Sequence, residues 1–153
     1  MPKFYSYYPH AQIAYSKISS VLLGIETKRA IDFGCSDFHN YPMFKTDFYI
    51  GADLDIENLK KGLEAHKNEN CIACLVDLAA LPQLKDLADL VVCTFTLIFF
   101  PSKKRLEIVA QLCDYTKAEG HLVLEAPNSP DVCLLYTSPS PRDATLSRMP
   151  SSA

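Results

Sequence analysis

The feature that most constrains this sequence is the stretch from Arg29 to Asp55, where one loop joins two short apolar runs. The first run, Ala30 to Phe33, contains a single acidic residue, Asp32, and leads into Gly34. The second run covers Phe48 to Ala52. Each run is too short for a helix, and the glycine between them permits a sharp turn of the backbone. The pattern predicts a strand, a tight turn, a short connection and a second strand.

The spacing of two acidic residues indicates what such a turn would bind. Asp53 closes the second apolar run and follows Asp32 by 21 residues. In nucleotide-binding α/β folds, an acid about 20 residues beyond the glycine turn lies at the tip of the second strand and accepts hydrogen bonds from ribose hydroxyls. The spacing therefore predicts an adenosine-containing ligand.

Two segments resemble motifs of a known enzyme family. DFGCSDF, from Asp32 to Phe38, is similar to the "LDxGCGxG" motif of class I S-adenosylmethionine-dependent methyltransferases. GADLDIENLKKG, from Gly51 to Gly62, resembles the second motif of this family, in which the acid, here Asp53, holds the ribose. The sequence departs from the pattern at Ser36 and Phe38, where the family usually has glycine. We expect Phe38 to add bulk where the backbone approaches the methionine end of the cofactor.

DLAALP, at 77–82, resembles the third motif of the same family and follows a strand expected at Cys71 to Val76. The resemblance assigns the Asp77 carboxylate to the amino group of adenine and the Leu78 backbone N–H to a ring nitrogen. A carboxylate suits an amine because it only accepts hydrogen bonds. Taken alone, Asp77 is equally typical of the start of a loop.

ADLVVCTFTLIFFP, at 88–101, resembles the fourth motif, whose loop faces the sulfonium and the substrate. Its β-branched run predicts a fourth strand. The resemblance then places Thr94 and Phe95 at the reacting centre. The apolar residues that follow suit either an apolar acceptor or a hydrophobic lid. A fifth strand is expected at His121 to Ala126.

The resemblance implies methyl transfer from S-adenosylmethionine to an unidentified small molecule. In-line displacement needs chiefly the alignment of nucleophile, methyl group and sulfonium, so no nucleophile triad is expected. The resemblance assigns Asp32, Gly34 and Ser36 to the methionine end of the cofactor. No general base is identified. The implied residues are Asp32, Gly34, Ser36, Asp53, Leu54, Asp77, Leu78, Thr94 and Phe95.

The resemblance also implies a Rossmann-like α/β fold. We expect a parallel sheet in the strand order 3-2-1-4-5, flanked by helices and incomplete at its C-terminal side. The ligand is expected over the carboxyl ends of strands one to three, at the switch in strand order.

Apolar periodicity and capping residues predict the helices between these strands. An N-terminal helix is expected to stop at Gly24, and a second helix to run from the N-cap Asp55 to about His66. A short helical connection is expected near Pro82 to Leu87. A further helix, capped by Ser102, is expected to end with Gly120 as a left-handed stop.

Composition narrows the class of protein and its partners. Of the 153 residues, 48% are hydrophobic and 22% are charged, which fits one soluble globular domain. A net charge of −3 argues against general nucleic-acid binding, which requires a basic surface. The longest apolar run, Leu90 to Phe100, is far shorter than the roughly 20 residues that a membrane helix needs. The sequence gives no indication of the oligomeric state.

Cysteine usage indicates a reducing compartment. The six cysteines lie in apolar segments and no export signal precedes them, so we expect reduced thiols in the cytoplasm. Cys71 and Cys74 form a C-x-x-C, but residues three apart on a strand point to opposite faces. A second ligand pair is lacking nearby, and the histidines have no ligand spacing, so we predict no metal site.

The C-terminal part differs in composition from the rest. From Asn128 onward, serine and proline cluster and the apolar periodicity ends. We therefore divide the chain into an N-terminal segment and helix at 1–28, a truncated methyltransferase-like cofactor-binding domain at 29–132 and a disordered tail at 133–153. The tail resembles translated adaptor sequence, and we interpret it as artefactual.

The sequence leaves two alternative functions open. An NAD(P)-dependent oxidoreductase shares the strand-turn-strand pattern, but the three-glycine fingerprint is missing and Asp32 would repel a pyrophosphate. A non-catalytic methyltransferase-like binding module is favoured by Phe38 and by the truncation. The resemblance implies an S-adenosylmethionine-dependent methyltransferase, and because of the truncation we expect activity of the full-length parent rather than of this chain.

Overall fold

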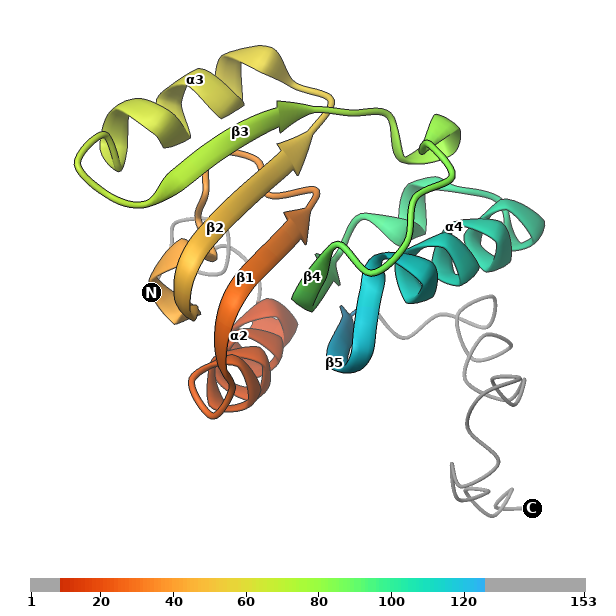
Figure 1. Ribbon diagram of the computed structural model, residues 1–153, viewed down its shortest axis with the longest axis horizontal. Helices are drawn as coiled ribbons and strands as arrows, with labels where there is room; N and C mark the ends of the chain where they lie inside the picture. Colours follow the sequence, from red (N-terminus) through yellow and green to blue (C-terminus); the bar gives the residue numbers. More distant parts are fainter. Residues whose placement is uncertain (1–8, 126–153) are drawn as a thin grey trace.

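A computed structural model of the chain describes residues 9–125. Within this part, five parallel strands form one sheet in the order β3-β2-β1-β4-β5 (Figure 1). The predicted Rossmann-like fold and strand order are therefore confirmed, whereas the predicted tail at 133–153 lies outside the described residues. The strands are β1 (Glu26–Phe33), β2 (Lys45–Asp53), β3 (Cys71–Leu75), β4 (Ala88–Thr94) and β5 (Thr116–Glu125).

Three α-helices cover the two faces of the sheet. The helices α2 (Pro9–Leu22) and α3 (Ile56–Ala65) pack on one face, and α4 (Ser102–Tyr115) packs on the other. The connection from β1 to β2 contains only a single helical turn, which agrees with the short connection that the sequence predicts. The short 3-10 turns are η1 (Tyr41–Met43), η2 (Leu78–Ala80) and η3 (Leu97–Phe99).

The alternation of side chains along β1 explains how one strand serves two cores. Ala30 packs with Ile18 beneath α2, whereas Ile31 and Phe33 pack beneath α4. Successive residues of a strand point to opposite faces, so Asp32 points to the face that α2 and α3 cover. A strand buried on both faces reads as a continuous apolar run, which is why β1 and β4 were recognisable in the sequence.

The predicted N-cap of α3 is confirmed. The Asp55 carboxylate accepts hydrogen bonds from the backbone N–H groups of Glu57 and Asn58, at 2.9 and 3.1 Å. These bonds satisfy two of the donors that the first turn of a helix leaves free. Leu59 and Gly62 form the buried side of α3.

Two predicted helical features are wrong. Residues 81–87 contain no helix, since the chain leaves η2 and reaches β4 as an irregular segment. Ser102 is not the N-cap of α4 but its first helical residue, and Pro101 takes the cap position without a side-chain hydrogen bond. A proline fixes its own φ near −65° and suits a helix start, so it displaces the serine from that role.

Gly120 is also not a helix stop. Helix α4 ends at Tyr115 and β5 begins at the next residue, so Gly120 lies inside the strand. A Cβ at this position would come within 2.8 Å of the Asp89 carbonyl oxygen. Gly120 therefore permits close approach of β4 and β5 rather than a left-handed turn.

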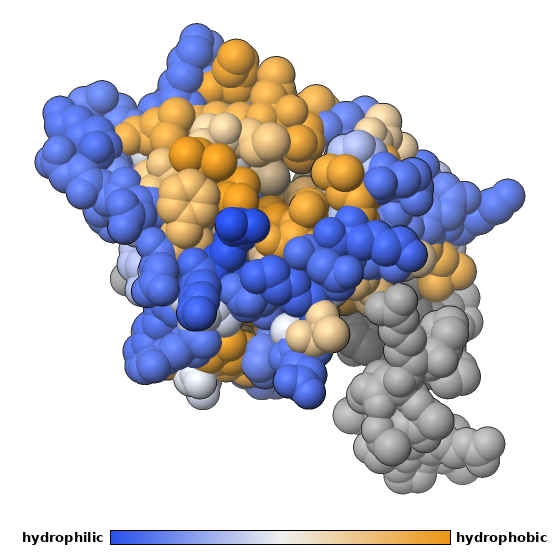
Figure 2. All heavy atoms as spheres, in the orientation of Figure 1, coloured by the Kyte–Doolittle hydropathy of each residue, from blue (hydrophilic) through white to orange (hydrophobic). Residues whose placement is uncertain are grey.

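The exposed surface is partly apolar. Figure 2 shows apolar side chains gathered over β2 and β3, and Ile72 and Leu75 of β3 are exposed. Among residues 9–125, none of the helices has the length and apolar character needed to cross a membrane.

Candidate functional site

The candidate site is the carboxyl edge of the sheet, where β1, β2 and β3 end side by side. Just after β3, Val76 donates its backbone N–H to the Asp53 carbonyl oxygen, at 2.9 Å, so Asp77 follows next to the end of β2. Just after β1, Gly34 donates to the Ala52 carbonyl oxygen, at 2.7 Å. The three carboxylates predicted from the sequence therefore stand at the ends of adjacent strands.

The loop after β1 places three alternate residues in the left-handed region. The φ angles are 75° at Gly34, 52° at Ser36 and 64° at Phe38. This conformation costs a residue with a side chain about 1 kcal/mol. Ser36 and Phe38 thus adopt the backbone that glycine would adopt at these positions. A residue with a side chain cannot replace Gly34, because a Cβ at this position would overlap the Thr96 side chain.

The Phe38 side chain points into the core and not toward the surface of this loop. Its side chain is 1% exposed and packs with Tyr49 and Leu59 beneath α3. Two glycines make room for the ring: a Cβ at Gly51 would overlap it, and a Cβ at Gly62 would lie 2.6 Å from its Cγ. The expectation that Phe38 adds bulk at the methionine end is wrong, because the ring fills the space that these glycines leave between β2 and α3.

Asp53 ties the loop after β1 to the end of β2. Its Oδ2 accepts a hydrogen bond from the Ser36 backbone N–H, at 2.8 Å, and its Oδ1 accepts one from the Asp55 backbone N–H, at 2.9 Å. A carboxylate offers about four acceptor positions, so two remain for hydroxyl groups of a ligand. The next residue, Leu54, is 68% exposed and places an apolar side chain beside this carboxylate.

Asp77 is exposed and organises the turn after β3. Its Oδ1 accepts a hydrogen bond from the Ala79 backbone N–H, at 2.8 Å, which makes Asp77 the N-cap of η2. The Leu78 side chain is buried in the core beneath α4. Leu78 can therefore contribute to a ligand site only through its backbone.

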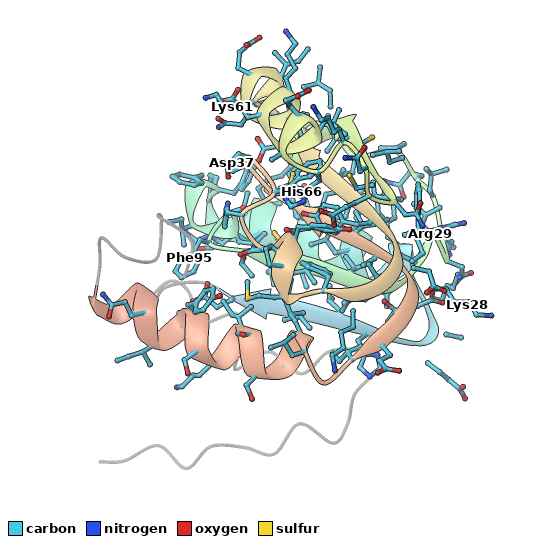
Figure 3. The ribbon with its side chains drawn as sticks, turned by 90° about the vertical axis from the view of Figure 1, so that its left-hand side faces the viewer. Lys28, Arg29, Asp37, Lys61, His66 and Phe95 are labelled. Carbon is cyan, nitrogen blue, oxygen red and sulfur yellow. The ribbon has the colours of Figure 1, made fainter. Side chains whose placement is uncertain are left out.

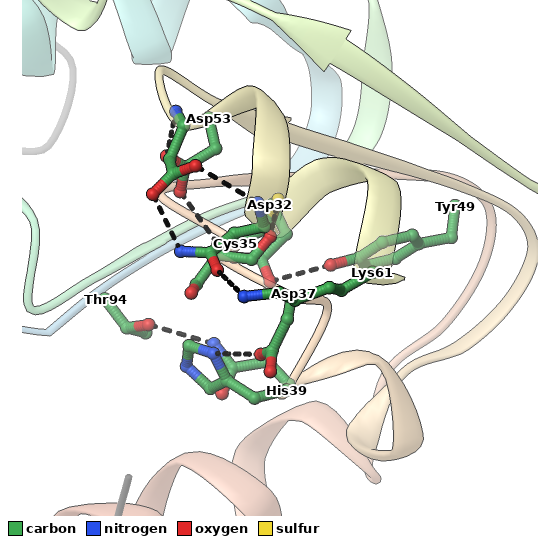
Figure 4. A network of polar contacts seen from close by, with 12 residues as sticks. Asp32, Cys35, Asp37, His39, Tyr49, Asp53, Lys61 and Thr94 are labelled. Atoms are coloured by element: carbon green, nitrogen blue, oxygen red, sulfur yellow. Dashed lines mark hydrogen bonds and ion pairs between the residues drawn. The ribbon is translucent and has the colours of Figure 1, made fainter. Parts of the chain in front are cut away.

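Asp32 is fully buried, although in the sequence it stands at the end of a strand as Asp53 and Asp77 do (Figure 4). Its Oδ2 accepts a hydrogen bond from the Tyr49 hydroxyl, at 2.9 Å, and its Oδ1 has no hydrogen-bond partner among residues 9–125. Burial raises the pKa of Asp32 to about 7, while the Tyr49 hydroxyl and the nearby Asn40 amide lower it and the charge of Asp53 raises it. The carboxyl group is thus poised between its two protonation states near neutral pH.

Thr94 and Phe95, at the end of β4, lie beneath the edge. Thr94 is 4% exposed, and its Oγ1 accepts a hydrogen bond from the Asn40 side-chain amide, at 3.0 Å. Phe95 has a left-handed backbone, with φ of 56°, and packs on the α2 side of the sheet (Figure 3). Thr94 therefore supports the edge from within the core, whereas Phe95 lies half-buried beside α2.

Sequence reasoning did not identify Tyr49 and Asn40 as site residues. A tyrosine within an apolar strand is typical of a core position, and an asparagine in a loop is typical of a turn. Neither residue carries a sequence signal for its hydrogen bond, because each bond joins residues that are distant in the chain.

The loop after β1 also carries a paired histidine. The Nδ1 atom of His39 lies 3.6 Å from Oδ1 of Asp37 (Figure 4). Burial lowers the pKa of His39, although Asp37 opposes this effect. Within the part of the chain that the structure describes, no group of three or more His, Cys, Asp or Glu residues is placed to hold a metal ion.

Solved structures with a similar arrangement are S-adenosylmethionine-dependent methyltransferases. The N-methyltransferase NodS from Bradyrhizobium japonicum WM9, in complex with S-adenosylhomocysteine (SAH), matches with a TM-score of 0.66 at 13% identity, over 76% of this chain and 61% of NodS. A methyltransferase from Clostridium acetobutylicum ATCC 824 has a TM-score of 0.65 at 16% identity, over 79% of this chain and 54% of its own.

A third methyltransferase, from Mesorhizobium loti, has a TM-score of 0.62 at 18% identity, over 72% of this chain and 51% of its own. This chain has the class I methyltransferase fold. It spans 51% to 61% of the length of the three solved proteins. No family model and no curated protein matches the sequence.

Proposed function

We propose that this chain binds S-adenosylmethionine along the carboxyl edge of its sheet and forms the cofactor-binding part of a methyltransferase that acts on a small molecule. The observation that carries the proposal is the placement of Asp32, Asp53 and Asp77 at the ends of three adjacent strands, beside the left-handed turn at Gly34. The shared fold with NodS, which was solved with SAH, supports the choice of ligand.

The adenosine half of the cofactor would lie over β2 and β3. The two remaining acceptor positions of Asp53 suit the two ribose hydroxyls. The exposed side chain of Leu54 offers an apolar surface for the face of the adenine ring. Asp77 and the backbone of Leu78 would then meet the polar edge of the base.

The methionine half would lie over β1 and β4. Asp32, Gly34 and Ser36 are the residues that would hold it, and the buried Asp32 carboxylate with an unpartnered oxygen suits a nearby cationic group. When bound, S-adenosylmethionine supplies an electrophilic methyl group on its sulfonium. The contribution of Thr94 and Phe95 is to fix the end of β4 beneath the ligand, so that the ligand is held in one orientation.

A non-catalytic binding module is the second candidate. This chain spans 51% to 61% of the length of the solved methyltransferases, so it matches only part of each of them. The burial of Phe38 beneath α3, in contrast, removes one argument for a module that cannot hold the cofactor.

Calorimetry of the complete chain with SAH, and in parallel with NAD, tests the proposal. We expect SAH to bind and NAD not to bind. Binding of NAD alone would favour the oxidoreductase alternative, and binding of neither would contradict the proposal. Incubation with methyl-labelled S-adenosylmethionine and pools of small metabolites then separates the two candidates, because only an enzyme transfers the label.

A further inference from the structure

Tyr49 is held in one orientation by the aromatic rings around it. It is fully buried, and its ring meets Phe38, Tyr41 and Phe44 edge-on, at centroid distances of 5.2, 4.7 and 5.1 Å. Because these contacts fix the ring, the hydroxyl has one direction, toward Asp32 Oδ2 at 2.9 Å. The arrangement places a neutral donor on a carboxyl group that is cut off from water.

The groups around Asp32 do not strongly favour either the ionised or the neutral form of its carboxyl group. The groups that act on it are two neutral donors, Tyr49 and Asn40, and one anion, Asp53. Two thiols also lie within range, but burial raises the pKa of Cys93 to about 12 and the pKa of Cys35 further still, so both are neutral. Among residues 9–125, the groups that shift the pKa of Asp32 therefore include no cation that would hold the carboxyl group ionised.

A ligand that brings a cation to this place would complete the arrangement. A positive charge within about 4 to 6 Å favours the ionised form of a carboxyl group. The amino acid part of S-adenosylmethionine and of SAH carries an α-ammonium group. We infer that the Tyr49 hydroxyl positions the Asp32 carboxylate and favours its ionised form, so that binding of the methionine end is linked to loss of one proton from Asp32. The inference rests on the proposed function.

The same geometry gives the direction of each effect. SAH is expected to bind more tightly as pH rises through the range in which Asp32 ionises. Loss of the Tyr49 hydroxyl removes a hydrogen bond to the carboxylate, so ionisation then requires a higher pH. A hydrogen bond to a charged group stabilises that form, so the midpoint is expected to move upward by roughly one pH unit or more.

Calorimetry between pH 5.5 and 8.5 tests the inference with the complete chain and two ligands. For SAH, we expect the affinity to rise at least tenfold between pH 5.5 and 8, with a midpoint near 7. Adenosine lacks the ammonium group, so its affinity is expected to stay constant over the same range.

Three variants assign the effect to its residues. Tyr49→Phe is expected to reach the same SAH affinity at a higher pH than the unaltered chain. Tyr41→Phe, the matched control, removes a hydroxyl from a neighbouring ring of the same cluster and is expected to leave the midpoint unchanged. Asp32→Asn is expected to bind SAH weakly and without pH dependence.

Each contrary result has a distinct meaning. If SAH binds with an affinity that does not depend on pH, or if adenosine shows the same dependence, the inference fails and the proposed function stands. A folded Tyr49→Phe variant with an unchanged midpoint overturns the role of Tyr49. If Tyr49→Phe unfolds, the Asp32→Asn profile decides, and a dependence like that of the unaltered chain overturns the inference. Absence of SAH binding at every pH overturns the proposed function and the inference together.

Discussion

Asp32 and Asp53 occupy equivalent places at the ends of neighbouring strands and yet meet different surroundings. The Asp53 carboxylate is half-buried and accepts hydrogen bonds from two backbone N–H groups, whereas Asp32 is fully buried and accepts one from a tyrosine hydroxyl. The end of β2 therefore offers fixed acceptors at the surface. The end of β1 offers a buried carboxyl group whose charge depends on pH. The comparison indicates that the two halves of the proposed ligand are recognised by different physical means.

The largest expected effect is on stability at the end of β1. The pKa of Asp32 is about 7 in the folded protein, whereas the ordinary pKa of this group is 3.8, so the folded state binds this proton more tightly. The protonated Asp32 carboxyl group therefore contributes to stability at low pH, and this contribution is lost as pH rises from about 4 to 7. Asp32→Asn is expected to match the unaltered chain at pH 4 and to be more stable at pH 8, by on the order of 4 kcal/mol.

Chemical denaturation at both pH values measures this difference. Asp47→Asn, at an exposed position of the adjoining strand β2, is the matched control and is expected to change the free energy of unfolding by less than about 0.5 kcal/mol. Equal stability of Asp32→Asn and the unaltered chain at pH 8 would show that the buried carboxyl carries no such penalty.

The next effect sharpens the comparison at the end of β2. Asp53→Ala removes the acceptors proposed for the ribose, and two hydrogen bonds to a charged group together account for at least about 100-fold in affinity. The loss is expected for adenosine and SAH alike, whereas Asp32→Asn is expected to weaken SAH alone. Calorimetry at pH 8 measures both ligands, with Asp47→Ala as the control. A loss confined to SAH in Asp53→Ala would remove the distinction between the two ends.

Gly51 lies between the two ends, opposite Asp32 in the register of β1 and β2. In Gly51→Ala the added Cβ would overlap the Phe38 ring, and overpacking of this kind costs about 1 to 3 kcal/mol. Thermal or chemical unfolding measures the loss. The double variant Gly51→Ala, Phe38→Leu is expected to recover part of it, because the smaller side chain frees the space. A double variant less stable than the sum of the single changes would contradict this packing.

The smallest expected effect concerns Ser36, whose hydrogen bond to Asp53 links the loop after β1 to the end of β2. Ser36→Gly keeps the backbone N–H that Asp53 accepts and removes the cost of a side chain in the left-handed region. The variant is expected to be more stable by up to about 1 kcal/mol. Ser102→Gly, at the first position of α4, is the control and is not expected to stabilise the protein. A lower stability of Ser36→Gly would contradict the cost assigned to this conformation.

The sheet and its acidic edge were predictable because they depend on local patterns. Buried parallel strands produce apolar runs, and the resemblance to a family supplied the order of the strands. The distance from Asp32 to Asp53 then placed both acids at strand ends. The N-cap at Asp55 was predictable for the same reason, since a cap depends only on the next few residues.

The features that could not be predicted depend on contacts between distant residues. The place of Phe38 is decided by Gly51 and Gly62, which lie on two other elements. The hydroxyl of Tyr49 finds Asp32 only after β1 and β2 have paired. Gly120 looks like a helix stop in the sequence, but the approach of β4 determines its role. Local patterns thus positioned the strand ends, and tertiary packing decided which side chains are exposed at the candidate site.

The most direct test of the account is a crystal structure of the complete chain with SAH at pH 8. The account predicts the ribose hydroxyls within hydrogen-bond distance of the Asp53 carboxylate, the adenine beside Asp77 and the backbone of Leu78, and the ammonium group above Asp32. SAH bound at any other surface, or with its ribose away from Asp53, would contradict the account.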